Sequence, residues 1–242
     1  MGAVDVVPFI PIRDVTMQDC VRLAEMFGET AAERFGIPIY LYAEAARTPS
    51  RKRLPDIRRG EYEGLEQKLA DPEWTPDFGP TEFNARSGAT ATGARSLLIA
   101  FNVNLDTDDK SEANRIAGRL RTSGVLRRNE EGEKIVGPDG EPERVPGRFD
   151  ALQAAGWMFD ESTAQVSMNL LDHATTGMHT VTEAIREEAE KIGLSVTAGE
   201  LVGLVPLDAL LAAGRFYHAE AASASEADLV HAAVSGLGLD RI

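Results

Sequence analysis

The sequence predicts an α/β protein whose larger, C-terminal part is built on a split βαβ sheet. Short apolar runs alternate with amphipathic segments along most of the 242 residues, as expected when strands and helices pack together. From residue 96 onward these segments follow the order β-α-β-β-α-β, which gives a four-stranded antiparallel sheet backed by two helices. The first third shows only a strand, a helix and a strand, which could belong to a similar unit.

The N-terminal elements follow from local signals. Residues 3–12 are typical of a buried strand interrupted by two prolines, and residues 37–42 of a second strand. Thr16 can cap a helix that runs from Met17 to about Gly36, where glycine ends it. Residues 44–93 look rich in loops, with one short helix at 54–59. Two strands and one helix bury little apolar surface, so we expect this part to need further strands, or to fold poorly or self-associate through an open sheet edge.

The remaining elements are predicted with clearer boundaries. We expect a strand at 96–105, a helix at 110–123 capped by Asp108, and a hairpin of strands 152–159 and 164–171. A helix at 176–192, a strand at 194–205 and two helices at 207–222 and 226–237 complete the chain. Residues 124–147 are polar and rich in Gly, Pro and Glu, which predicts an exposed, mobile insertion.

Charge and composition exclude several classes of function. The chain has 25 basic and 39 acidic residues, a net charge of −14, which argues against nucleic acid and anionic membranes as partners. No apolar run reaches ~18 residues, and the N-terminus lacks the pattern of a signal peptide. The one cysteine, Cys20, excludes an internal disulfide and suits a reducing cytoplasm. We therefore expect a cytoplasmic protein.

The most informative segment is the non-periodic stretch 74–95, because long irregular segments in compact domains are often binding or lid loops. Its aromatic rings, hydrogen-bonding side chains and glycines together suit a flat heteroaromatic ligand. Those rings and polar groups are Trp74, Phe78 and Phe83, and Thr81, Asn84, Arg86 and Ser87. The alternative is an irregular connector with buried aromatics, which composition alone favours slightly.

A basic patch lies between the second strand and this segment. It consists of Arg47, Arg51, Lys52, Arg53, Arg58 and Arg59. Such a patch could bind substrate carboxylates. Alternatively, it could be a solvated loop held by Glu61 and Glu63. The sequence supports the two interpretations equally.

The histidines do not form an evident reactive site. His173, His179, His218 and His231 are the four. His179 is expected to cap or pack rather than touch substrate, and its spacing from His173 puts the two rings on different helix faces, which disfavours a metal site. Ser87 and Cys20 lack a neighbouring histidine motif, so nucleophilic catalysis is not supported.

Several stretches, taken in order, resemble the family of glutamate formiminotransferases, the folate enzymes of histidine breakdown. They are 1–12 (MGAVDVVPFIPI), 39–47 (IYLYAEAAR), 54–63 (LPDIRRGEYE), 76–80 (PDFGP), 88–95 (GATATGAR), 165–171 (QVSMNLL) and 201–206 (LVGLVP). The resemblance covers nearly the whole chain except residues 124–147.

The resemblance implies an α+β sandwich of two ferredoxin-like βαββαβ-type subdomains, 1–97 and 98–242, the first incomplete, with the substrate cleft between them. It implies a homodimer or larger homo-oligomer that transfers the formimino group from N-formimino-L-glutamate to tetrahydrofolate. The family's folate-binding stretch falls on Gly79, Pro80, Thr81, Glu82, Phe83, Asn84, Ala85, Arg86, Ser87 and Gly88. We expect Phe83 to pack on the pterin or benzoyl ring and Arg86 to make a polar or carboxylate contact.

One departure concerns the catalytic group. The histidine proposed as the family's acid/base precedes the segment that matches Met1, so no catalytic residue is assigned within this chain. The implied reaction needs an acid/base to move protons between two nitrogens as the folate amine attacks the amidine carbon. The alternative to an active transferase is a non-catalytic folate-binding fragment, or one subunit of a split enzyme.

Overall fold

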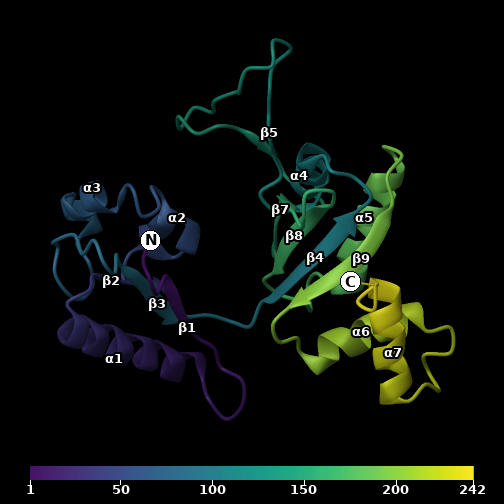
Figure 1. Ribbon diagram of the computed structural model, residues 1–242, viewed down its shortest axis with the longest axis horizontal. Coiled ribbons are helices and arrows are strands. Elements are labelled where there is room, and N and C mark those ends of the chain that lie inside the picture. Colours follow the sequence, from purple (N-terminus) through teal and green to yellow (C-terminus); the bar gives the residue numbers. More distant parts are fainter. Residues whose placement is uncertain (242) are drawn as a thin grey trace. The chain divides into compact units, whose positions relative to one another are not determined.

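A computed structural model describes residues 1–241, which form two compact units divided in sequence between Leu97 and Leu98. Each unit has its own sheet (Figure 1). Each also has its own hydrophobic core. None of the helices in residues 1–241 is both long and apolar enough to cross a bilayer.

The N-terminal unit is a three-stranded parallel sheet with helices on both faces (Figure 1). The strand order is β1 (Val6–Phe9), β3 (Thr90–Ala94), β2 (Ile39–Ala43), so the last strand in sequence lies in the middle. The helices are α1 (Met17–Phe35), α2 (Leu54–Arg58) and α3 (Leu65–Leu69), with short 3₁₀ turns η1 (Pro49–Arg51) and η2 (Pro72–Trp74).

The alternation of β2 fixes which helix covers which face, because successive side chains point to opposite sides of a strand. Tyr40 and Tyr42 pack with α2 and α3, whereas Ile39 and Leu41 pack with α1. The predicted helix of this unit is confirmed: Thr16 caps α1 through the Asp19 amide, and Gly36 ends the helix in the left-handed conformation at φ 61°.

Two expectations for this unit are corrected. Residues 90–94, predicted to belong to a structureless segment, form the fully buried central strand β3. The expected pair of lone strands is therefore a three-stranded sheet within the chain itself. Its strands are all parallel, unlike the alternating antiparallel strands of a ferredoxin-like unit.

The C-terminal unit confirms the predicted βαββαβ order. Its antiparallel sheet has the order β7-β8-β4-β9, from β7 (Leu152–Met158), β8 (Ala164–Leu170), β4 (Ile99–Leu105) and β9 (Val196–Val202). Helices α4 (Lys110–Leu120) and α5 (Met178–Glu190) pack against one face of the sheet, and α6 (Leu207–Tyr217) and α7 (Glu226–Leu237) extend the same core.

Two local details of this unit differ from prediction. The cap of α4 is Asp109, whose Oδ1 accepts from the Ser111 amide at 2.8 Å, rather than Asp108. The polar insertion also contains paired structure: β5 (Val125–Leu126) pairs with β6 (Arg144–Val145), and isolated bridges continue the pairing beyond them.

Candidate functional site

The loop Gly79–Gly88 is fixed to the N-terminal unit at both ends. Before it, the Ile39 amide donates to the Phe78 carbonyl at 2.9 Å. After it, the Ala3 amide donates to the Ser87 carbonyl at 3.0 Å, and Gly2 and Gly88 form an isolated bridge. The span between these anchors is held in place by the sheet while its middle residues remain accessible to a ligand.

Glycine is required at both ends of the loop. Gly79 has φ 86°, and a Cβ there would lie 2.4 Å from the Ile37 carbonyl oxygen. Gly88 has φ 63°, and a Cβ there would lie 2.2 Å from the Met1 carbonyl oxygen. These φ values favour glycine, and the contacts leave no room for another residue.

Asn84 shapes the second half of the loop. Its side-chain oxygen accepts from the backbone amides of Arg86 and Ser87, at 3.1 and 3.0 Å, and its carbonyl accepts from the Gly88 amide at 2.7 Å. This is an Asx turn, a standard use of asparagine. The structure therefore occupies the Asn84 oxygen within the loop, whereas the Arg86 side chain is exposed and makes no ion pair or hydrogen bond with residues 1–241.

Phe83 is the aromatic ring within the loop. It is half-buried, packs at the edge of the cluster around Tyr40 and Leu65, and lies with its centroid 5.5 Å from that of Tyr62 at a tilt of 55°. The Tyr62 hydroxyl donates to the Ala85 carbonyl at 2.5 Å. Tyr62 thus supports the loop and its ring together, a role that sequence reasoning missed although the residue lies within a stretch resembling the family.

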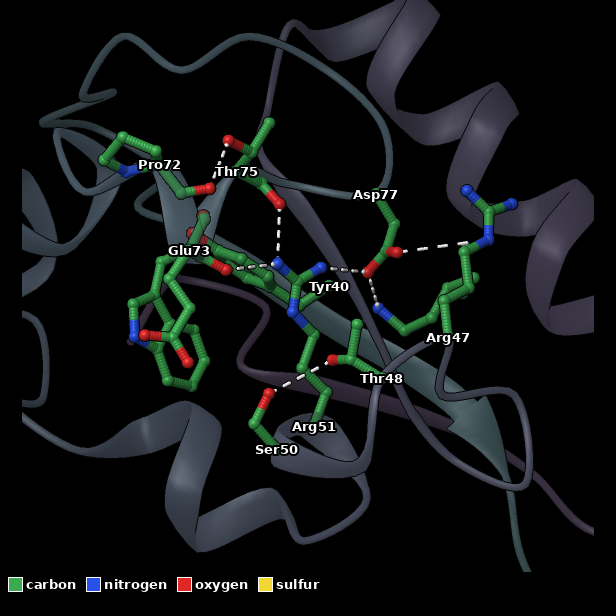
Figure 2. A network of polar contacts seen from close by, with 11 residues as sticks. Tyr40, Arg47, Thr48, Ser50, Arg51, Pro72, Glu73, Thr75 and Asp77 are labelled. Carbon is green, nitrogen blue, oxygen red and sulfur yellow. Dashed lines mark hydrogen bonds and ion pairs between the residues drawn. The ribbon is translucent and has the colours of Figure 1, made fainter.

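A buried ion pair secures the chain just before the loop (Figure 2). Arg51 donates to Asp77 Oδ2 at 2.9 Å and to the carbonyls of Glu73 and Thr75 at 3.0 and 2.8 Å. Asp77 Oδ2 also accepts from the Leu41 amide of β2 at 2.8 Å. The exposed fractions of the two side chains are 7% for Arg51 and 4% for Asp77, so the pair is shielded from solvent.

The aromatic residues before the loop belong to this structural support. The Tyr40 hydroxyl donates to the Trp74 carbonyl at 2.7 Å, and burial raises the pKa of Tyr40 to about 12, so the donor keeps its proton. The Trp74 ring lies beneath Lys68 and Arg51, and the Phe78 ring packs against α1 and beneath Arg47. All three rings predicted to face a ligand therefore pack against the core of this unit, and Phe83 is the one that belongs to the loop itself.

The arginines of the basic patch have separate roles in the structure. The acidic residues that pair with them differ from those expected. Arg53 and Arg59 pair with Asp56, and Arg58 pairs with Asp5, rather than with Glu61 and Glu63. Arg51 is interior, as described above. Arg47 lies 3.9 Å from Asp77, and its side chain is 48% exposed.

The histidines lie in the C-terminal unit. His179 follows the first residue of α5, and its ring stacks on Phe216 with centroids 4.9 Å apart. Burial holds the pKa of His179 below its ordinary value. This is the packing role that the sequence favoured. His173 approaches Asp208 at 4.0 Å, and residues 1–241 contain no group of three or more side chains suited to hold a metal ion.

Comparison with known proteins agrees with this division into two units. A family model described as the formiminotransferase domain, N-terminal subdomain, matches residues 1–95, and a model for the formiminotransferase domain matches residues 100–242. The chain is 51% identical over 218 residues to formimidoyltransferase-cyclodeaminase of Mus musculus, covering 90% of this chain and 37% of that protein.

Two microbial relatives are also similar. Glutamate formimidoyltransferase of Streptococcus pyogenes is 37% identical over 218 residues, covering 90% of this chain and 66% of that protein. The enzyme of the same name from Thermoplasma acidophilum is 37% identical over 218 residues, covering 89% of this chain and 65% of that protein. The chain thus spans little more than a third of the mouse protein and about two thirds of the microbial ones.

Proposed function

Because this chain belongs to the formiminotransferase domain family, we propose that it takes part in transferring the formimino group from N-formimino-L-glutamate to tetrahydrofolate. The products are 5-formimidoyltetrahydrofolate and glutamate. The names of the relatives support the class of reaction. Residence in the cytoplasm, a place in histidine degradation and assembly into a homodimer or larger homo-oligomer belong to the same proposal.

The observation that carries the proposal is the construction of the loop Gly79–Gly88. Its ends are fixed by the sheet, its turn is closed by Asn84, and its ring Phe83 is supported by Tyr62. A ligand that binds such a loop meets a partly exposed aromatic ring and the free side chains of Thr81, Glu82 and Arg86. A reduced pterin with its benzoyl-glutamate tail offers a flat ring and carboxylates, which match this combination.

The contribution of these residues to the reaction is the positioning of the acceptor. The nitrogen at position 5 of tetrahydrofolate must approach the amidine carbon, and holding two reactants in that geometry can contribute roughly 7–11 kcal/mol. A loop with preset backbone conformations loses little entropy when it binds. Arg86, whose exposed side chain has no ion pair among residues 1–241, is available for the carboxylates. Arg47 is 48% exposed and could reach a ligand as well, although it lies 3.9 Å from the buried Asp77.

The proposal is tested by substituting Phe83. We expect Phe83→Ala to weaken binding of tetrahydrofolate by about 1–3 kcal/mol, the scale of an aromatic anchor, measured by calorimetry with the full chain. The control is Phe35→Ala, which removes a 70% exposed ring at the end of α1 in the same unit and should leave affinity unchanged. Equal affinities for all three proteins would refute the role of Phe83.

The same proteins distinguish the two candidate functions. Formation of 5-formimidoyltetrahydrofolate from N-formimino-L-glutamate and tetrahydrofolate supports the transferase. Binding of tetrahydrofolate without turnover supports the non-catalytic folate-binding fragment or the subunit of a split enzyme. A wild-type chain that binds neither substrate contradicts both.

A further inference from the structure

The sheet of the C-terminal unit has a polar face on the side opposite α4 and α5. Because side chains alternate along a strand, the apolar residues of β4 and β8 point into the core and the residues between them point away. The strand register arranges these outward positions in three rows of four. The rows are Gln153, Asn169, Ala100 and Val202; Ala155, Ser167, Asn102 and Glu200; and Trp157, Gln165, Asn104 and Ala198.

The composition of this face is unusual for a solvated sheet. It holds several Asn and Gln side chains, one carboxylate, Glu200, and no Lys, Arg or Asp. Asparagine is depleted in strands, and breaches of local preference concentrate at functional sites. The register between β4 and β9 also shifts between Asn104 and Leu105, an irregularity of the kind found near binding sites.

Hydrogen bonds within the face fix the position of Glu200. Asn102 Nδ2 donates to Glu200 Oε2 at 2.9 Å, and Gln165 Nε2 donates to the same oxygen at 3.4 Å. Gln165 Nε2 also donates to Asn104 Oδ1 at 2.9 Å, and both of these amides are buried. The carboxylate of the half-buried Glu200 is thereby oriented by one side chain from β4 and one from β8.

Much of the hydrogen-bonding capacity of the face remains unused. Within residues 1–241, Glu200 Oε1 accepts no hydrogen bond, and the side chains of Ser167, Asn169 and Gln153 make none to another residue. A carboxylate accepts only, whereas the amides and the hydroxyl can both donate and accept. The face is therefore suited to a planar polar group that presents N–H donors to Glu200 and mixed polar atoms around it.

We propose that Glu200 binds the N–H donors of an amidine-type group of a substrate through Oε1. This inference rests on the proposed function, in which both substrates carry such a group: the formimino amidinium of N-formimino-L-glutamate, and the 2-amino-pyrimidinone edge of the pterin. A carboxylate pairs well with a planar set of N–H donors and favours the cationic form of an amidine. The lone negative charge disfavours the carboxylates of either substrate at this face.

The test compares Glu200→Gln with Glu190→Gln in the full chain. Glutamine keeps an oxygen for Asn102 and Gln165 but loses the charge. Glu190 is an exposed residue of α5 whose side chain makes no hydrogen bond or ion pair among residues 1–241, so it controls for the loss of one negative charge. Binding of N-formimino-L-glutamate and of tetrahydrofolate is measured separately by calorimetry, and unfolding in urea verifies that each variant is folded.

We expect Glu200→Gln to weaken binding of one substrate by about 10- to 100-fold, the range for losing a charge-assisted hydrogen bond, while Glu190→Gln stays within twofold of wild type. Weaker binding of N-formimino-L-glutamate identifies the amidinium as the ligand, and weaker binding of tetrahydrofolate identifies the pterin. Glu200→Asp, which keeps the charge on a shorter side chain, should recover part of the loss.

Unchanged affinity of a folded Glu200→Gln for both substrates overturns the inference and leaves the proposed function intact. A wild-type chain that binds neither substrate overturns the proposed function and this inference with it. Equal weakening of binding by Glu190→Gln and Glu200→Gln overturns this inference alone, because the effect then comes from net charge rather than from this face.

Discussion

At the scale of single residues, Asp77 joins more parts of the candidate site than any side chain of the loop itself. It accepts from the backbone of β2 and from Arg51, which in turn holds the carbonyls of Glu73 and Thr75 (Figure 2). Residue 77 lies only two positions before Gly79. A change in the geometry of this buried ion pair would therefore displace the start of the loop.

We expect Asp77→Asn to lower the free energy of unfolding by about 3–5 kcal/mol, the cost of removing one partner of a buried ion pair. The reason is that the Arg51 guanidinium would stay buried without its counter-charge. Urea unfolding measures the effect. Asp56→Asn is the control, because its partners Arg53 and Arg59 are 70% and 79% exposed, and an exposed pair contributes under about 1 kcal/mol. Equal losses for both variants would contradict a special role for Asp77.

A second prediction at this scale concerns pH. Burial lowers the pKa of His179 in the folded protein, so the unfolded chain binds a proton at a higher pH than the folded chain does. The contribution of His179 to the free energy of unfolding is then fully present above the ordinary histidine pKa of about 6.5, and it is lost as the pH drops below that value. Nuclear magnetic resonance titration of the His179 ring should give a pKa below the ordinary histidine value of about 6.5.

The linked effect on stability is checked with His179→Gln, which should flatten the fall in unfolding free energy between about pH 6.5 and 5. His231→Gln, which changes an exposed histidine of α7, is measured alongside as the control. A measured pKa for His179 at or above about 6.5 would show that the packing against Phe216 does not disfavour the charged ring.

At the scale of elements, the sequence predicts best where local chemistry determines the answer. The capping residues Thr16 and Gly36 define α1, and the alternating pattern around residues 160–163 predicts the hairpin of β7 and β8. The order β-α-β-β-α-β likewise predicts the strand pairing of the C-terminal sheet. In each case the signal lies within a few residues, so no knowledge of distant contacts is needed.

Strand β3 is an element that local sequence signals do not predict. Its sequence, TATGA, has no large apolar residue and includes a glycine, both unfavourable for a strand. The structure explains the small residues: a Cβ at Gly93 would lie 2.2 Å from the Tyr42 carbonyl oxygen, and Thr90 and Thr92 donate to carbonyls of the neighbouring N-terminal segment. Tight packing between two parallel neighbours, set by distant contacts, outweighs the local preference.

The candidate site likewise has features that local sequence predicts and features that depend on distant contacts. Glycines and aromatic residues in a non-periodic segment made residues 74–95 a binding candidate, although composition alone slightly favoured a connector, and the narrower loop Gly79–Gly88 was identified through the family resemblance. The support from Tyr62 and Asp77, and the convergence of Asn102, Gln165 and Glu200, depend on strand register and on contacts between residues far apart in sequence. The register of the strands cannot be deduced from a single sequence.

At the scale of the whole molecule, the free edge of β1 bears on how the chain associates. Among residues 1–241, β1 pairs only with β3. The carbonyls of Asp5, Val7 and Phe9 accept hydrogen bonds from the side of β3, so the backbone groups of Val6 and Pro8 point to the open edge. Proline has no N–H, and natural sheets use it to weaken edges that could pair with another chain.

Pro8 therefore acts against the self-association that an open edge would otherwise favour. We expect Pro8→Val to restore the missing donor and to strengthen self-association several-fold, because one more main-chain hydrogen bond becomes available to a second chain. Sedimentation velocity over a range of protein concentrations measures this, with Pro138→Val in the exposed insertion as the control. If Pro8→Val and wild type sediment alike at every concentration, the β1 edge is not an association surface, and any homo-oligomer must form through another face.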